Sequence, residues 1–179
     1  MPTVRGRDLR VLFDAAAIDR RNAAIAQEIA AAGYSDLVVI SILKGSFIFA
    51  ADLIRALSGA GLEPEVEFLA LSSYGEGIES TGRVRVVRDI ETDVRGRDVL
   101  LVDDILESGR TLAFARDLMQ ERGARRVAIA VLLDKRGKRA AAVEADHVGF
   151  DCPDYFVVGY GMDVAHAFRE LPYVGVIED

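Results

Sequence analysis

The sequence has 179 residues, of which 51% are hydrophobic and 28% charged, and its formal net charge is −7. These values fit one globular domain over residues 1–179 and argue against broad binding of nucleic acid, which needs a basic surface. No apolar run reaches the roughly 20 residues of a membrane span, and the N-terminal segment has no apolar stretch typical of a secretory signal. The single cysteine, Cys152, excludes an internal disulfide. We therefore expect a cytoplasmic protein without a membrane or nucleic-acid partner.

Helical and strand-like patterns alternate along the chain. Asp14 can cap a helix over residues 15–32, where isoleucines recur on one face, and Gly33 is suited to end it. Further helices are expected over residues 45–58 and 111–122. Apolar runs that predict strands lie at residues 37–43, 66–71, 84–87, 99–102 and 127–133, with a glycine-dotted loop at 73–83.

This alternation predicts an α/β fold, with a mostly parallel twisted sheet flanked by helices. Sheets of this kind bind ligands beyond the carboxyl ends of their strands. The residues that directly follow positions 43, 102 and 133 are therefore the first candidates for a functional site.

The segment after the apolar run at 99–102 carries the most specific pattern. Two adjacent acids, a third acid and small polar residues precede and begin a predicted helix: Asp103, Asp104, Glu107, Ser108, Gly109, Arg110 and Thr111. Paired carboxylates suit ribose hydroxyls or a hard divalent cation, and the free N–H groups at a helix start suit a phosphate. A capped helix with solvated acids is the competing interpretation, but the combined pattern favours a sugar phosphate. The ending of a Walker A loop is absent.

These residues resemble a known motif. LLVDDILESGRTL (residues 100–112) is similar to the pyrophosphate–sugar motif of type I phosphoribosyltransferases. The resemblance to the hypoxanthine–guanine branch of that family extends over LKGSFIFAADLIR (43–55), SSYGEGIESTGRV (72–84), LLDKR (132–136), GFDCPDYFVVGYGMD (149–163) and FRELPYVGV (168–176). It implies the type I phosphoribosyltransferase fold, with a small hood and a mobile active-site loop. It also implies transfer of a phosphoribosyl group from phosphoribosyl pyrophosphate to a 6-oxopurine by a homodimer or homotetramer that uses Mg²⁺.

The resemblance assigns roles on the sugar-phosphate side. Asp103 and Asp104 would hold the ribose hydroxyls, partly through Mg²⁺, and Asp163 would be a second metal contact. Residues 107–111 would receive the 5′-phosphate. The pyrophosphate would be contacted by the loop of Lys44 and Gly45, which has a non-proline cis peptide in the family. Arg169 would be a further cation on the pyrophosphate side.

On the base side, the resemblance places Lys135 against the purine O6, Phe156 on the ring face and Val157 at the Watson–Crick edge. Glu107 would accept a proton near N7, although the family commonly has Asp at this position. Without the resemblance, Lys44 and Lys135 would be interpreted as solvated cations and Phe156 as a core residue. Ser73 and Tyr74 would belong to a lid whose movement is permitted by Gly75, Gly77 and Gly82.

Two other functions compete with this interpretation. One is a xanthine or pyrimidine phosphoribosyltransferase, and the other is a nucleotide-sensing regulator of the same fold that binds RNA. Lys135 together with Phe156 favours a purine over a pyrimidine. The net charge of −7 and the segment DYFVVGY (154–160) speak against RNA binding.

Overall fold

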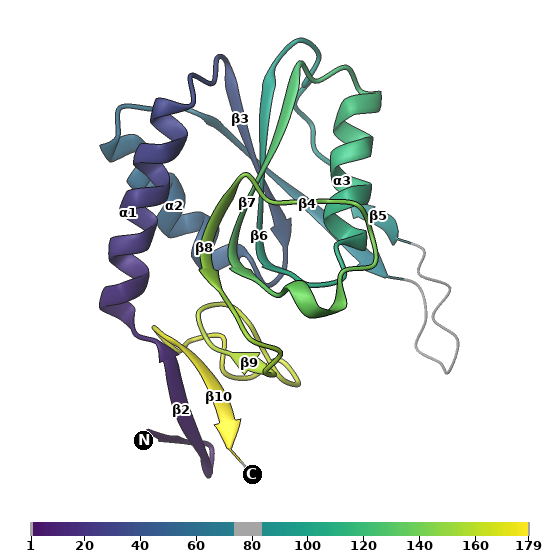
Figure 1. Ribbon diagram of the computed structural model, residues 1–179. Coiled ribbons are helices and arrows are strands. Elements are labelled where there is room, and N and C mark those ends of the chain that lie inside the picture. The colour runs from purple at the N-terminus through teal and green to yellow at the C-terminus, as the bar shows by residue number, and fades with distance from the viewer. Residues whose placement is uncertain (1, 74–83, 179) are drawn as a thin grey trace.

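The computed structural model describes residues 2–73 and 84–178. A six-stranded sheet lies between helices, and a four-stranded sheet extends from one end of it (Figure 1). The larger sheet has the strand order β5-β4-β3-β6-β7-β8 and is parallel except for β5, which pairs antiparallel with β4. Its strands are β3 (Leu37–Leu43), β4 (Glu65–Ser73), β5 (Val84–Arg88), β6 (Asp98–Leu106), β7 (Arg126–Asp134) and β8 (His147–Asp151). The predicted α/β class is confirmed.

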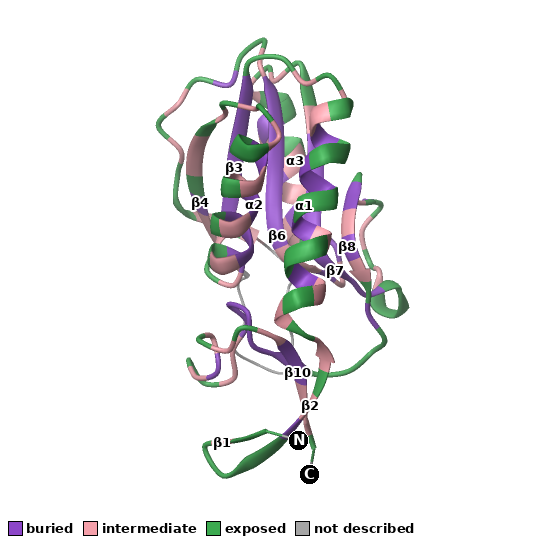
Figure 2. Ribbon diagram, turned by 90° about the vertical axis from the view of Figure 1, so that its left-hand side faces the viewer, coloured by how far each residue is buried: buried purple, intermediate pink, exposed green. Residues whose placement is uncertain are grey.

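Helices cover the two faces of this sheet unequally. α1 (Ala15–Ala31) and α2 (Phe47–Gly59) pack on one face, and α3 (Arg110–Glu121) packs on the other. Because successive side chains of a strand point to opposite faces, Leu100 of β6 packs with α1 and α2, whereas its neighbour Leu101 packs with α3. Buried residues accordingly concentrate along β3 and β6 (Figure 2). None of the helices in the described ranges is long and apolar enough to cross a membrane.

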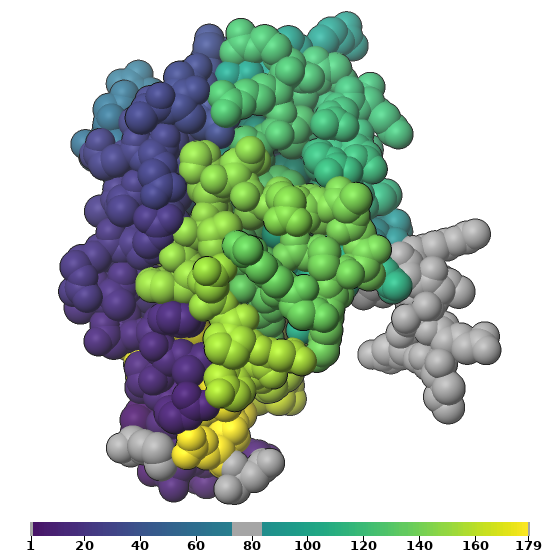
Figure 3. Space-filling view, viewed as in Figure 1, coloured from purple at the N-terminus to yellow at the C-terminus, as the bar shows by residue number. Residues whose placement is uncertain are grey.

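The smaller sheet is built from both ends of the chain. It has the order β1-β2-β10-β9, and its strands are β1 (Thr3–Val4), β2 (Arg7–Phe13), β10 (Val174–Glu178) and β9 (Val157–Val158). Figure 3 shows the purple N-terminal segment and the yellow C-terminal segment side by side at this end of the molecule. A local cluster of Leu9, Val158 and Phe168 forms its core. This sheet is the hood that the family resemblance implied, although the hydrophobic pattern had not predicted β1, β2 or β10.

β6 is longer than its apolar run suggested. The expected strand stopped at residue 102, but β6 continues to Leu106. Asp103 still pairs with Val131 of β7, and Ile105 pairs with Leu133. The two acids therefore lie within the carboxyl end of a paired strand, which restrains their backbone.

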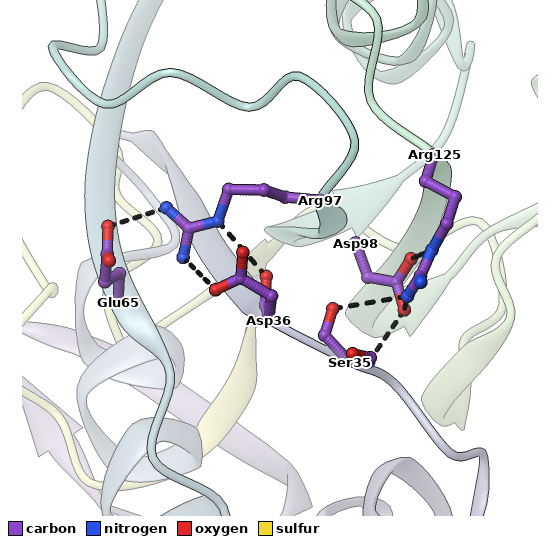
Figure 4. Close-up of polar contacts among 6 residues, drawn as sticks. All are labelled: Ser35, Asp36, Glu65, Arg97, Asp98 and Arg125. Atoms are coloured by element: carbon purple, nitrogen blue, oxygen red, sulfur yellow. Dashed lines mark hydrogen bonds and ion pairs between the residues drawn. The ribbon is translucent and has the colours of Figure 1, made fainter.

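The amino ends of the parallel strands are closed by ion pairs (Figure 4). Arg97 binds the carboxylates of Asp36 and Glu65, each at 2.9 Å. The buried carboxylate of Asp98 accepts hydrogen bonds from Arg125, at 2.9 and 2.7 Å, and these hydrogen bonds lower the pKa of Asp98. At the carboxyl end of β6, by contrast, two acids, Asp103 and Asp104, are adjacent in the chain.

Candidate active site

Two adjoining cavities of about 740 and 320 Å³ open at the carboxyl ends of β3, β6 and β7, as the fold rule predicts. Of the predicted residues, the larger cavity is lined by Lys44, Gly45, Asp104, Glu107, Lys135, Phe156, Val157, Asp163 and Arg169. The smaller cavity is lined by Lys44, Gly45, Asp103, Asp104, Glu107, Ser108, Gly109 and Thr111. The shared wall makes the two cavities one continuous site.

The acid pair lies at the junction of the cavities. The Asp103 carboxylate accepts the N–H of Asp104 at 2.9 Å, and the Asp104 carboxylate accepts the N–H of Ile105 at 2.8 Å. Burial, reinforced by the neighbouring Asp104 carboxylate, raises the pKa of Asp103 well above its ordinary value. Burial also raises the pKa of Asp104, and the charge of Arg169 partly opposes this effect. Two crowded carboxylates of this kind are a donor set suited to a hard cation or to hydroxyl groups.

This donor set alone does not make a complete metal cage. Within residues 2–73 and 84–178, no three His, Cys, Asp or Glu side chains gather closely enough to hold a metal ion. Asp163 lies in the wall of the larger cavity and pairs with Arg169, Nη2 to Oδ1, at 2.7 Å. Mg²⁺ usually takes one or two carboxylates and completes its shell with water and substrate oxygens, so the acid pair fits Mg²⁺ as a partial ligand set.

Lys44 and Gly45 form a loop pressed between two other segments. The peptide bond Leu43–Lys44 is cis, which confirms the non-proline cis peptide expected in this loop. A Cβ at Gly45 would lie 1.8 Å from Oδ2 of Asp104, and a Cβ at Gly161 would lie 2.3 Å from the carbonyl oxygen of Gly45. Glycine is therefore needed at both positions for the loop to contact the acid pair.

The predicted phosphate loop leads directly into α3. Gly109 is the N-cap residue, with φ 78°, and a Cβ there would lie 2.5 Å from Cγ1 of Val143. The N–H of Arg110 donates to Oγ of Ser108 at 3.4 Å. The first turn of α3 contains no acidic residue, so no side-chain carboxylate of that turn competes for its remaining N–H groups, which lie beside the smaller cavity. The side chain of Arg110 is exposed and lines neither cavity, unlike Ser108 and Thr111.

The far wall of the larger cavity combines a buried lysine with an exposed aromatic ring. Lys135 is 6% exposed, and its Nζ donates to the carbonyl of Tyr155 at 2.6 Å. The same Nζ lies 3.8 Å from Oε1 of Glu107. Phe156 is 64% exposed and thus is not a core residue, whereas Val157 is buried and starts β9. An exposed ring beside a buried ammonium group is suited to a planar base that carries an acceptor.

Arg169 and Asp163 belong to one turn at the rim of the larger cavity. Arg169 donates to the carbonyl of Gly161 at 2.6 Å, and Asp163 accepts the backbone N–H of His166 at 2.7 Å. These bonds hold the two charged groups together on the side of the cavity that faces the Lys44 loop, because Gly161 lies against Gly45.

The predicted lid begins at the end of β4. Ser73 is the last residue of β4, and Tyr74 and the glycines of the predicted lid lie outside the described residues. Conversely, the larger cavity has wall residues that we did not predict: Leu43, Leu71, Ile105, Lys138, Asp154, Tyr155 and Met162. Lys138 belongs to the basic run DKRGKR (134–139), and Asp154, Tyr155 and Met162 lie within the segment 149–163 that carries the family resemblance. Nζ of Lys138 pairs with Asp154 at 2.9 Å and lies 3.9 Å from Glu107.

The fold and these cavities define an α/β protein in which a cavity at the start of α3 adjoins a cavity with an aromatic wall. The sequence model of the phosphoribosyl transferase domain matches residues 11–165. Hypoxanthine phosphoribosyltransferase of Escherichia coli K12 is 44% identical over 143 residues, which cover 80% of this chain and 79% of the relative. Hypoxanthine-guanine phosphoribosyltransferase of Aquifex aeolicus is 41% identical over the full length of both chains.

Solved structures agree with the sequence comparisons. A hypoxanthine phosphoribosyl transferase of Trypanosoma cruzi superposes with a TM-score of 0.91 at 37% identity, covering 99% of this chain and 95% of the other. One from Staphylococcus aureus gives 0.88 at 37% identity, covering 94% and 91%. The chain therefore belongs to the phosphoribosyltransferase family, in the branch of hypoxanthine and hypoxanthine-guanine phosphoribosyltransferases.

Proposed function

We propose that this enzyme transfers the phosphoribosyl group of phosphoribosyl pyrophosphate to N9 of hypoxanthine or guanine, forming IMP or GMP in purine salvage. The observation that carries the proposal is one continuous site that joins the acid pair, a helix start without acids and the Lys135–Phe156 wall. The family membership supports the same reaction. In the reaction the N9–C1 bond forms, the bond from C1 to the pyrophosphate oxygen breaks, and the base loses a proton.

The smaller cavity would hold the sugar phosphate. The N–H groups of residues 108–111 and the positive end of α3 would bind the 5′-phosphate. Asp103 and Asp104 would accept hydrogen bonds from the ribose hydroxyls. A buried carboxylate close to C1 also stabilises the positive charge that develops on the ribose as the pyrophosphate departs.

Asp103 and Asp104 would hold Mg²⁺ together with substrate oxygens, and Asp163 would be a second metal contact. Mg²⁺ bound there would supply neutralising charge for the departing pyrophosphate. Lys44 and Arg169 line the same region and would add positive charge on the pyrophosphate side. Because Asp163 pairs with Arg169 at 2.7 Å, its carboxylate would contact the arginine and the metal at the same time.

The larger cavity would hold the base. Lys135 uses one hydrogen bond on the Tyr155 carbonyl, and an ammonium group has three donors, so it retains donors for the purine O6. Phe156 would stack on the ring, and the backbone of Val157 would face the Watson–Crick edge. Glu107 lies 3.8 Å from Lys135, which supports a place for its carboxylate near N7, where it would accept the proton. These contacts suit a 6-oxopurine and favour it over a pyrimidine.

Steady-state rates with phosphoribosyl pyrophosphate, Mg²⁺ and a panel of adenine, guanine, hypoxanthine, xanthine and uracil test the proposal. We expect turnover of hypoxanthine or guanine that is abolished by excess chelator and restored by Mg²⁺. Turnover of xanthine or uracil alone would assign the site to another base. Filter binding with cellular RNA distinguishes the regulator, which would retain RNA and lack turnover.

We further propose that the enzyme is a homodimer or homotetramer in the cytoplasm. Sedimentation of the purified enzyme measures the size of this oligomer.

A further inference from the structure

The phosphate loop turns its carbonyl oxygens away from the cavity and toward residues 135–141. The carbonyl of Leu106 accepts the backbone N–H of Lys135 at 2.9 Å. The carbonyl of Ser108 accepts the N–H groups of Ala140 and Ala141, at 2.9 and 3.0 Å. A carbonyl oxygen that faced the cavity would repel a phosphate oxygen. These bonds therefore leave the N–H side of the loop for an anion.

The carbonyl between them, that of Glu107, is held by a side chain. Nε of Arg139 donates to it at 3.0 Å. The same guanidinium donates through Nη1 to the carbonyl of Val143 at 2.7 Å and through Nη2 to the carboxylate of Asp134. The Arg139 side chain is 16% exposed and that of Asp134 is 2% exposed. The guanidinium is thus enclosed and bonded on three of its nitrogens.

Arg139 lies between the end of β7 and the phosphate loop. Asp134 is the last residue of β7 and directly precedes Lys135, which lines the base side of the site. Gly109, on the phosphate side, packs so closely that a Cβ there would lie 3.1 Å from Cδ of Arg139. Arg139 itself belongs to the wall of neither cavity. It links the phosphate loop to the end of β7 without reaching the substrates.

We propose that Arg139 is a positioning residue that fixes the carbonyl of Glu107 away from the cavity and thereby sets the affinity for the 5′-phosphate. The planar guanidinium forms this fork because it donates in fixed directions to several acceptors, which a lysine cannot reproduce. The inference rests on the proposed function only in that the smaller cavity receives a 5′-phosphate.

A comparison of GMP with guanosine isolates the phosphate. Calorimetric titration of both ligands gives the ratio of their affinities for the wild type, Arg139→Met and Arg139→Lys. Arg116→Met is the matched control, because Arg116 donates to the carbonyl of Ala142 at 3.0 Å in the same segment, and its hydrogen bonds and ion pair go to Ala142 and Asp117 rather than to residues 106–109. KM for phosphoribosyl pyrophosphate and for hypoxanthine is measured in parallel.

We expect Arg139→Met to lower the affinity for GMP about tenfold or more and that for guanosine less than about twofold, since a carbonyl is released into the loop. KM for phosphoribosyl pyrophosphate should rise by a similar factor, while KM for hypoxanthine stays near the wild-type value. Arg139→Lys should give a ratio of GMP to guanosine affinity between those of the wild type and Arg139→Met. It is the deciding variant if Arg139→Met does not fold. Arg116→Met should retain the wild-type ratio.

A wild-type ratio of GMP to guanosine affinity in the folded Arg139 variants would overturn the inference. Equal losses for GMP and guanosine would also overturn it, because they would indicate a structural role only. Failure of the proposed function is distinguishable from both outcomes, because the wild type itself would then show no preference for GMP over guanosine and no transfer.

Discussion

A methyl group added at Gly45 tests the core of the site directly. The Cβ of Gly45→Ala would lie 1.8 Å from Oδ2 and 2.8 Å from Cγ of Asp104, whereas Cβ contacts essentially never fall below 3.0 Å. The carboxylate or the Lys44 loop must therefore move by more than about 1 Å. Asp104 cannot yield freely, because it lies in β6 and its other oxygen accepts the N–H of Ile105 at 2.8 Å.

The size of the effect follows from this geometry. Forcing extra atoms into a packed site costs about 1–3 kcal/mol, and we expect the free energy of unfolding to fall by about 1–2 kcal/mol because one side of the loop faces a cavity. A misplacement of about 1 Å in a group that positions substrate costs on the order of 100-fold in rate. We therefore expect kcat/KM for phosphoribosyl pyrophosphate to fall by about 100-fold.

Urea denaturation and steady-state kinetics with varied phosphoribosyl pyrophosphate measure both quantities. Gly59→Ala is the control, because Gly59 ends α2 and a Cβ there meets no atom within 4 Å. That variant should keep the wild-type kcat/KM and should gain up to about 1 kcal/mol of stability from the helix propensity of alanine. A Gly45→Ala enzyme with the wild-type kcat/KM would refute the reasoning that the contact between the loop and Asp104 organises the site.

Further predictions concern the base, the proton and the far edge of the sheet. Lys135→Met should lower kcat/KM for hypoxanthine and guanine by about 100-fold or more while phosphoribosyl pyrophosphate still binds; unchanged kinetics would mean that the base lies elsewhere. Glu107→Gln should lower kcat about tenfold or more with little change in KM for phosphoribosyl pyrophosphate, and Glu107→Asp should stay active; a Gln variant with full kcat and rate-limiting chemistry would exclude the residue as proton acceptor. Because Arg125 lowers the folded-state pKa of Asp98, its stabilisation is present above the unfolded value of about 3.9 and is lost as pH falls through the lower folded value. Asp98→Asn should thus lower the free energy of unfolding by about 1–2 kcal/mol near neutral pH, a value that is discounted because Arg125 is half-exposed, and by less below about pH 4. Urea unfolding across pH measures this difference, and parallel plots of the free energy of unfolding against pH for the two proteins would contradict it.

Local patterns predicted five strands of the larger sheet but not β8, and the clearest signals came from β3, β6 and β7, which are covered on both faces. The N-cap of α1 formed as predicted, with Asp14 accepting the N–H of Ala17 at 2.7 Å. The hood strands lacked such a signal. β9 has two residues, and β2 mixes arginine and aspartate with apolar residues because much of it is exposed. Pairing between distant chain ends, not local pattern, creates that sheet.

The location of the two cavities was predictable from the sequence, but the side-chain contacts around them were not. The rule for parallel sheets indicated the strand ends, and the family resemblance supplied roles for Lys135 and Phe156, whose types alone favoured a surface cation and a core ring. Neither approach indicated that Arg139 would bond to Glu107, because the two are separated by 32 positions and meet only when β6 and β7 pair. Such contacts are products of the register between strands.

The two edges of the parallel sheet show why function belongs to one of them. At the amino edge, arginines bind the carboxylates of Asp36, Glu65 and Asp98, and their charge is neutralised within the protein. At the carboxyl edge, burial raises the pKa of Asp103 and Asp104, which means that the fold keeps their ionised forms at a cost in free energy. A bound cation or a ribose diol would remove that cost. The acid pair would therefore favour the binding of such a ligand, whereas the ion pairs of the amino edge stabilise the fold.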